Sequence, residues 1–289
     1  MAAAGTLFGY GIRSAFTHER LSPAPGRRGT IEIGDCAAVT LDETAVVHRA
    51  EDGDTSFAIG RAADGTLAIE CSAAGGFRLD AAHLRLLADR PPPGDDLWEH
   101  RLVSVALPLL LAERGDIALH AAAVAQDDQG VAFAGASTRG KSTLAVAASA
   151  AGLDVLADDG AVFDVADAWP IAWPGPVGAR VAALGAGTKS TTPLGAAPLR
   201  PACLAAIAIL GPLADGPTEL DRLSPSAAVP ALVPSLIFAG SDRLPDALRS
   251  AAWLAERVPV YRCRLPNGLD GLPAAVAAVV DRLLSPAGE

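Results

Sequence analysis

Residues 135–143, Gly-Ala-Ser-Thr-Arg-Gly-Lys-Ser-Thr, have the types and spacing of a phosphate-binding loop. They fit the pattern G-x-x-x-x-G-K-[ST] at every fixed position. In this pattern backbone N–H groups surround the phosphates, the lysine reaches the terminal phosphates and the hydroxyl ligates Mg²⁺. Lysine occurs only at positions 141 and 189, so its place here is informative. The segment predicts a site for ATP, or a similar polyphosphate, and Mg²⁺, with Ser142 as metal ligand. The predicted binding residues are Gly135, Ala136, Ser137, Thr138, Arg139, Gly140, Lys141, Ser142 and Thr143.

Two adjacent carboxylates, Asp158 and Asp159, follow the next strand-like segment after this loop. Ligands of open α/β sheets gather at the carboxyl ends of strands, so we expect the pair to lie near the bound phosphates. One carboxylate can hold Mg²⁺, and the other can accept the proton of an attacking hydroxyl. The alternative is a solvated Asp-Asp-Gly turn, which is common in proteins. The phosphate loop just upstream favours the functional interpretation.

Histidine and basic side chains elsewhere provide further candidates. His120 ends the strand-like segment before the loop strand, where a neutral imidazole could bond a phosphate or orient an aspartate. A structural histidine is the alternative. Arg180 and Lys189 could contact the nucleotide or the acceptor, or remain solvated in their loops. The other histidines have no metal-ligand spacing and are predicted at the surface: His18, His48, His83 and His100.

The second half of the chain alternates strand-like and helix-like segments, which is typical of an α/β protein. Strands are predicted over residues 117–120, 121–125, 131–134, 154–157, 161–164, 203–210 and 258–265. Helices are predicted over residues 141–151, 245–257 and 272–284. The strand over 131–134 leads directly into the loop and the helix over 141–151 follows it, and this is the context in which phosphate loops occur.

The first half has a different pattern. Short apolar or alternating runs, separated by Gly or Asp-Gly turns, predict a small antiparallel sheet with strands over residues 30–33, 45–48, 56–59 and 66–70. The Pro-Pro-Pro-Gly run at 91–94 is a stiff break. We therefore predict a β-rich N-terminal domain over residues 1–95, with substrate binding as its hypothetical role. A phosphate-loop domain over residues 96–289 follows, and it opens with a helix over 96–114 that Gly115 ends.

Composition excludes several classes of protein. The net charge is −10 and no basic block is present, which argues against a nucleic-acid partner. The four cysteines are scattered with no Cys-x-x-Cys pair, which argues against zinc or disulfides and fits a reducing cytosol. No signal peptide is recognisable, and the longest apolar stretch, 102–112, is too short to span a bilayer. We expect a cytoplasmic protein that does not insert into a membrane.

Three segments carry a family resemblance: LHAAAVA at 119–125, GVAFAG at 130–135 with the loop after it, and GLDVLADD at 152–159. Together they resemble the HPr kinase/phosphorylase catalytic domain. The order of histidine, phosphate loop and Asp-Asp is also similar to that of phosphoenolpyruvate carboxykinases, which share the fold. The resemblance covers about residues 120–164. It implies a carboxykinase-like α/β phosphate-loop core that uses ATP and Mg²⁺.

The resemblance also implies roles for the matched positions. Lys141 and Ser142 would bind phosphate and Mg²⁺. Asp158 would be the general base that accepts the proton of a serine hydroxyl, and Asp159 would be a metal-associated carboxylate. His120 would lie beside them and take part in catalysis. Because HPr kinases are hexameric, a homo-oligomer is a further expectation.

The chain departs from HPr kinases in three places. Thr138 stands where their loop usually has glycine, and residues 1–95 differ from their usual N-terminal domain. Residues 174–180 contain no carboxylate, although HPr kinases carry an acidic segment in this region. The last difference argues against HPr as acceptor and against a reverse phosphorylase activity. The layout is instead similar to HPr kinase-like proteins of peptide-modification clusters, some of which phosphorylate a lasso precursor peptide on serine.

The sequence therefore predicts an ATP- and Mg²⁺-dependent kinase that transfers the γ-phosphoryl group to a serine hydroxyl. The expected acceptor is a peptide or small protein, with a lasso precursor peptide as one hypothesis. An HPr serine kinase and a small-molecule kinase are alternatives within the same class. A non-catalytic ATP-sensing module is the alternative from another class, and Thr138 is the residue that keeps it open.

Overall fold

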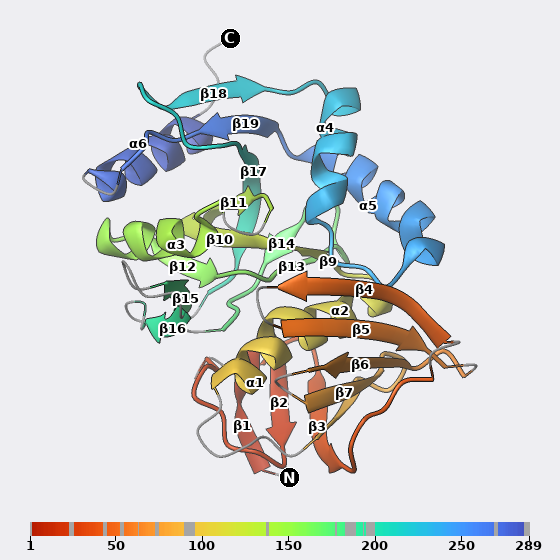
Figure 1. Cartoon of the computed structure of the whole chain (residues 1–289). Coiled ribbons are helices and arrows are strands. Elements are labelled where there is room, and N and C mark those ends of the chain that lie inside the picture. The colour runs from red at the N-terminus through yellow and green to blue at the C-terminus, as the bar shows by residue number, and fades with distance from the viewer. Residues whose placement is uncertain are drawn as a thin grey trace.

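The computed structural model is a mixed α/β structure with two large sheets and helices between and around them (Figure 1). This confirms the mixed α/β class that the sequence predicted. The structure describes residues 2–22, 26–42, 45–52, 55–62, 64–72, 75–89, 96–136, 139–176, 178–182, 189–192, 194, 200–268 and 271–285.

The described N-terminal residues form an eight-stranded sheet in the order β1-β2-β3-β8-β7-β6-β5-β4. Its strands are β1 (Ala2–Leu7), β2 (Tyr10–Ser14), β3 (Thr30–Cys36), β4 (Val46–Asp52), β5 (Thr55–Arg61), β6 (Leu67–Cys71), β7 (Gly75–Asp80) and β8 (Arg85–Asp89). The four predicted strands are present, but the expected small antiparallel sheet was wrong in extent and type. The pairs β2–β3 and β3–β8 are parallel, and four strands were missed. Strand β1 begins with a run of three alanines and lacks the alternation on which the prediction depended.

One helical stretch connects the two halves of the chain. It consists of α1 (Asp96–Arg101), the π-helical η2 (Leu102–Ala106) and α2 (Leu107–Arg114), and it confirms the predicted helix. Gly115 ends it with φ +113°, a left-handed conformation that favours glycine. Trp98 and Leu109 lie in the same hydrophobic cluster as the eight-stranded sheet. The domain boundary stays a prediction, and residues 90–95 lie outside the described part of the chain.

The second sheet has nine strands among the described residues, in the order β12-β10-β11-β17-β14-β13-β9, with β19 beside β17 and β18 beside β19. Its strands are β9 (Ile117–Leu119), β10 (Ala121–Gln126), β11 (Gln129–Ala134), β12 (Asp154–Ala157), β13 (Ala161–Asp164), β14 (Ile171–Ala172), β17 (Ala202–Leu210), β18 (Glu219–Arg222) and β19 (Val260–Arg264). A separate hairpin joins β15 (Ala179–Ala182) and β16 (Lys189–Thr192). The seven strands predicted for this half are confirmed within two residues at each end.

Helices cover both faces of this sheet (Figure 1). They are α3 (Lys141–Ala150), α4 (Pro225–Leu232), α5 (Leu244–Arg257) and α6 (Leu272–Leu284), with short 3₁₀ turns η3 (Val233–Ser235) and η4 (Ser241–Arg243). Alternate residues of β10 point to opposite faces. Ala122 and Val124 join the core under α3 and α6, whereas Ala121 and Ala123 join the core under α4 and α5. Helix α4 was not predicted from the sequence, because prolines interrupt its helical pattern.

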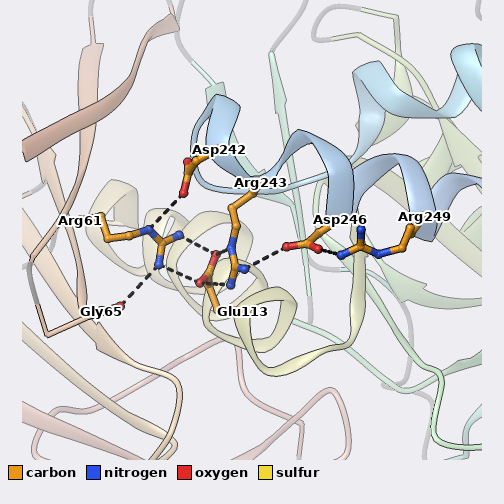
Figure 2. A network of polar contacts seen from close by, with 7 residues as sticks. All are labelled: Arg61, Gly65, Glu113, Asp242, Arg243, Asp246 and Arg249. Atoms are coloured by element: carbon orange, nitrogen blue, oxygen red, sulfur yellow. Dashed lines mark hydrogen bonds and ion pairs between the residues drawn. The ribbon is translucent and has the colours of Figure 1, made fainter.

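An ion-pair network joins strand β5 of the N-terminal sheet to the end of α2 and to the segment formed by η4 and α5 (Figure 2). The carboxylate of Glu113, at the end of α2, accepts two hydrogen bonds of 3.0 Å from Arg61 of β5. It accepts two more from Arg243 of η4, at 3.2 and 2.8 Å. Arg243 also pairs with Asp246 of α5, and Asp246 pairs with Arg249. Because its side chain is only 10% exposed, Glu113 depends on these partners to remain charged.

We predict that Glu113→Gln lowers the free energy of unfolding by about 1–3 kcal/mol at neutral pH, since two arginines lose their carboxylate. Burial raises the pKa of Glu113, but hydrogen bonds from Arg243 and Arg61 outweigh it and hold this pKa below its ordinary value. A carboxylate with a lowered pKa in the folded state stabilises the fold above the unfolded pKa of about 4.3. That contribution is lost as the pH falls through the folded pKa. Urea unfolding of the wild type and of Glu113→Gln should therefore show a difference in the free energy of unfolding that becomes smaller below about pH 4.

The control for this measurement is Glu70→Gln, which changes an exposed glutamate of β6. We expect it to change the free energy of unfolding by less than about 0.5 kcal/mol. Equal effects of the two variants would contradict a special role for Glu113.

Candidate functional site

The register of three strands brings the predicted site residues to one edge of the second sheet. Strand β10 lies between β11 and β12 and is antiparallel to both, so β11 and β12 run in the same direction. Ala121 at the start of β10 pairs with Ala134 at the end of β11, and Ala123 pairs with Ala157 at the end of β12. Residue 120, the loop after 134 and the carboxylates after 157 therefore meet at this edge.

Two glycines shape the described part of the loop. A side chain at Gly135 would put its Cβ 3.3 Å from both the Cβ and the carbonyl oxygen of Leu210 in β17, which is tight. Gly140 precedes α3 with φ +81°, in the left-handed region that favours glycine. Ala136 and Arg139 are exposed, whereas the predicted ligands Ser137 and Thr138 lie outside the described residues.

Lys141 is the first residue of α3, and it is buried. Its Nζ donates to the carbonyl oxygens of Gly135 and Ala136, at 2.9 and 3.1 Å. The same Nζ lies 4.0 Å from Oδ1 of Asp159. Ser142 and Thr143 follow in the first turn of α3 and are half-buried. The lysine ammonium thus lies between the loop backbone and the second predicted carboxylate.

The two aspartates have different surroundings. Asp158 is completely buried, with an exposed fraction of 0%. The side chain of Asp159 is 26% exposed, and its Oδ1 faces the ammonium group of Lys141. Asp159 has φ +67°, a left-handed conformation that aspartate tolerates better than most residues. Non-glycine residues in this region cost about 1–3 kcal/mol and often occur at functional sites.

His120 contacts Asp159 with both ring nitrogens. Its Nδ1 lies 3.0 Å from the carbonyl oxygen of Asp159, and its Nε2 lies 3.3 Å from Oδ1. Since a carbonyl oxygen only accepts, Nδ1 carries a proton in this contact. The backbone N–H of His120 donates to the carbonyl oxygen of Ser235, at 2.6 Å. The ring therefore lies beside the aspartate, and its catalytic role stays a prediction.

A second histidine at the site was missed by the sequence analysis. His100 of α1 was expected at the surface but is buried, and its Nε2 lies 3.7 Å from Oδ2 of Asp159. The surface prediction was also wrong for the side chain of His18, which is 0% exposed. His48 and His83 are exposed, as predicted. Packing of α1 onto the second half of the chain brings His100 to the site, and local sequence carries no trace of such long-range contacts.

The remaining candidates, Arg180 and Lys189, lie on the hairpin of β15 and β16. Their side chains are outside what the structure describes, so their roles stay predictions.

The oxygen donors at the site suit Mg²⁺. Within the described ranges, no group of three or more His, Cys, Asp or Glu side chains is arranged to hold a metal ion. Mg²⁺ is usually held by one or two protein oxygens together with phosphate oxygens and water. The hydroxyl of Ser142 and the exposed carboxylate of Asp159 are donors of this kind, so the fit to a nucleotide-bound Mg²⁺ is good. None of the helices in the described part of the chain has the length and apolar character needed to cross a membrane.

Comparisons with known proteins add little to this picture. No protein-family model matches the chain, and no curated protein matches it either. Among solved structures, the Hpr(Ser) kinase/phosphatase from Coxiella burnetii is similar, with a TM-score of 0.33 and 14% sequence identity. The match covers 57% of this chain and 88% of that chain. The chemistry of the site has to be inferred from its own residues.

The backbone next to Asp159 packs directly on the π-helical segment. A Cβ at Gly160 would lie 3.0 Å from the carbonyl oxygen of Ser104 and 3.2 Å from its Cα. Both are backbone atoms, so neither can move without shifting η2. A π-helical turn inside an α-helix is rare and frequently occurs at functional sites. This contact therefore fixes the distance between the central helix and the Asp158–Asp159 turn.

We predict that Gly160→Ala lowers the free energy of unfolding by about 1–3 kcal/mol, because the added methyl group overpacks this contact. The matched control is Gly130→Ala in β11, where a Cβ would meet its nearest atoms at an ordinary 3.5 Å. Chemical denaturation of both variants measures the difference. Wild-type stability of Gly160→Ala would show that η2 and the turn move apart freely.

Proposed function

We propose that the chain is an ATP- and Mg²⁺-dependent phosphotransferase that phosphorylates a hydroxyl group, with a serine of a peptide or small protein as the acceptor. The observation that supports this most is the convergence of Lys141 and Asp159. Their charged atoms lie 4.0 Å apart at the end of a strand–loop–helix unit with the complete phosphate-loop pattern. A lysine that reaches terminal phosphates and a carboxylate beside them are the groups that phosphoryl transfer requires.

In the proposed reaction the loop backbone and Lys141 bind the β- and γ-phosphates, and Ser142 contributes its hydroxyl to Mg²⁺. When bound, Mg²⁺ neutralises charge on the phosphates. The acceptor oxygen forms a bond to the γ-phosphorus while the bond from that phosphorus to ADP breaks. The hydroxyl proton passes to a carboxylate of the Asp158–Asp159 pair. His120 holds the backbone of Asp159 in place, because its Nδ1–H donates to the carbonyl oxygen of Asp159.

The burial of the two aspartates bears on which one accepts the proton. The sequence resemblance assigns the base to Asp158, but its side chain is fully buried. Asp159 is partly exposed beside Lys141, where an acceptor can meet it directly. We therefore favour Asp159 as the proton acceptor, with Asp158 as a buried support of the turn.

Nucleotide binding is tested with Lys141→Met. We expect affinity for MgATP to fall about 10- to 100-fold, which corresponds to the loss of a charged hydrogen-bonding group. Affinity for adenosine should stay within a factor of about two, because the lysine contacts only phosphate. Isothermal titration calorimetry with both ligands measures this split. An equal loss for both ligands would point to a folding defect instead of a phosphate contact.

Phosphoryl transfer is tested by the intact mass of candidate acceptors after incubation with the protein, ATP and Mg²⁺. A precursor peptide encoded beside the gene and HPr are tested in parallel. We expect one added phosphate on the peptide. With Asp159→Asn the rate of transfer should fall by about 100-fold or more. Asp158→Asn is the matched variant, and it should keep more activity than Asp159→Asn if the burial argument holds.

The outcomes of this assay separate the hypotheses. Loss of transfer in Asp159→Asn with normal MgATP binding assigns Asp159 to proton transfer, whereas loss of Mg²⁺-dependent binding assigns it to the metal. Phosphorylated HPr with an unchanged peptide would establish the HPr kinase alternative. Tight MgATP binding without transfer to either acceptor would favour a small-molecule acceptor or the ATP-sensing module.

A further inference from the structure

The buried His100 lies between the N-terminal region and the candidate site. Its Nε2 faces Oδ2 of Asp159 at 3.7 Å. On its other side, Nδ1 lies 3.1 Å from Nη1 of Arg20 and 3.2 Å from the hydroxyl of Ser104. His100 thus connects an arginine from the loop after β2 to the carboxylate beside the phosphate loop.

The Arg20 contact determines which nitrogen of His100 carries the proton. A guanidinium group only donates hydrogen bonds and stays charged in proteins, so Nδ1 of His100 must accept. A neutral ring that accepts at Nδ1 carries its proton on Nε2. Nε2 is the nitrogen that faces Asp159. The arginine therefore makes His100 an N–H donor toward the aspartate.

Arg20 itself is held firmly. It is buried, and its Nη2 donates to the carbonyl oxygen of Gly178, at 2.8 Å. Its backbone N–H donates to Oε1 of Glu99, at 3.0 Å, which ties the loop to α1 next to His100. With both the backbone and the side chain fixed, the guanidinium group has a defined position relative to the imidazole.

The conformation of Asp159 depends on contacts from neighbouring side chains. Its backbone is in the left-handed region, and such conformations persist only where surrounding contacts determine them. His120 and Lys141 both approach Oδ1, at 3.3 and 4.0 Å, whereas His100 approaches Oδ2. Contacts to both oxygens fix the rotation of the carboxylate, which contacts to one oxygen leave free. The 3.7 Å separation is longer than a hydrogen bond, and catalytic contacts of this kind often tighten when substrate binds.

We propose that His100 is a positioning residue that orients Asp159 through its Nε2–H, and that Arg20 sets the tautomer required for this. The kinetic consequence of the proposal rests on the phosphotransferase function proposed above, but the tautomer does not. The N-terminal region thereby contributes to the site through Arg20, which lies far in the sequence from the phosphate-loop pattern.

The tautomer is tested by long-range ¹H–¹⁵N correlation spectra of protein labelled with ¹⁵N-histidine. The chain has five histidines, and the ring signals lost in His100→Gln identify His100. We expect the Nε2–H pattern for His100 in the wild type and in Arg20→Lys, which keeps a cationic donor. In Arg20→Met we expect a mixture of tautomers. A wild-type ring protonated on Nδ1, or on both nitrogens, would overturn the proposal whatever the activity of the protein.

The kinetic arm compares two amides at position 100. The amide nitrogen of Gln takes the place of Nε2, whereas the amide nitrogen of the shorter Asn takes that of Nδ1. We expect His100→Asn to lower kcat about 10- to 100-fold with KM for MgATP nearly unchanged, as is typical when a group that orients a ligand is lost. His100→Gln should restore kcat to within about threefold of the wild type. The exposed His83→Asn is the control.

The outcomes distinguish the positioning role from a structural one. Equal loss of kcat in the Gln and Asn variants, or wild-type kcat in the Asn variant, would overturn the donor role of Nε2. If the wild type transfers no phosphate, the proposed function fails. The spectra, with the effect of Arg20→Met on them, then decide the tautomer separately.

Discussion

The antiparallel placement of β10 between β11 and β12 is the constraint on which the candidate site depends. It makes β11 and β12 parallel although they are not neighbours, so the loop after β11 and the turn after β12 emerge at the same edge. It also brings the start of β10, and with it His120, between the two. The small side chains of β10 let core residues pack tightly on both faces of the sheet, which keeps this register rigid.

The site also depends on the first half of the chain. The central helix packs in the core of the N-terminal sheet, yet its residues 100 and 104 reach the Asp158–Asp159 turn of the second half. The Glu113 network joins the same two halves at the other end of this helix (Figure 2). With both ends of the helix fixed, the distance from His100 to Asp159 becomes a property of the fold as a whole. An arrangement of this kind accounts for a left-handed aspartate that isolated turns do not readily hold.

Much of the second half could be predicted from its sequence, because short apolar strands, glycine stops and the loop pattern are local features. The central helix was predictable for the same reason. Local patterns did not reveal α4, which prolines interrupt, or the Ala-rich strand β1 of the first sheet. Above all they could not place His100 and Arg20, which are 80 residues apart and meet only through packing. The unequal burial of Asp158 and Asp159 was hidden as well, since neighbours in sequence carry no record of what packs around each side chain.

The electrostatics of the site explain why a nucleotide would need Mg²⁺ here. Among the described residues, Lys141 is the lysine whose ammonium group lies at the loop. It donates to two loop carbonyl oxygens and faces Asp159. A triphosphate has to replace those carbonyl oxygens as acceptor, and it brings several negative charges close to a carboxylate in a chain of net charge −10. Repulsion between phosphate and carboxylate is strong where water is partly excluded. A divalent cation bound to the phosphates would offset this repulsion, so the carboxylate would oppose the free nucleotide more than its magnesium complex. If the proposed function holds, the position of Asp159 would thus favour MgATP over free ATP.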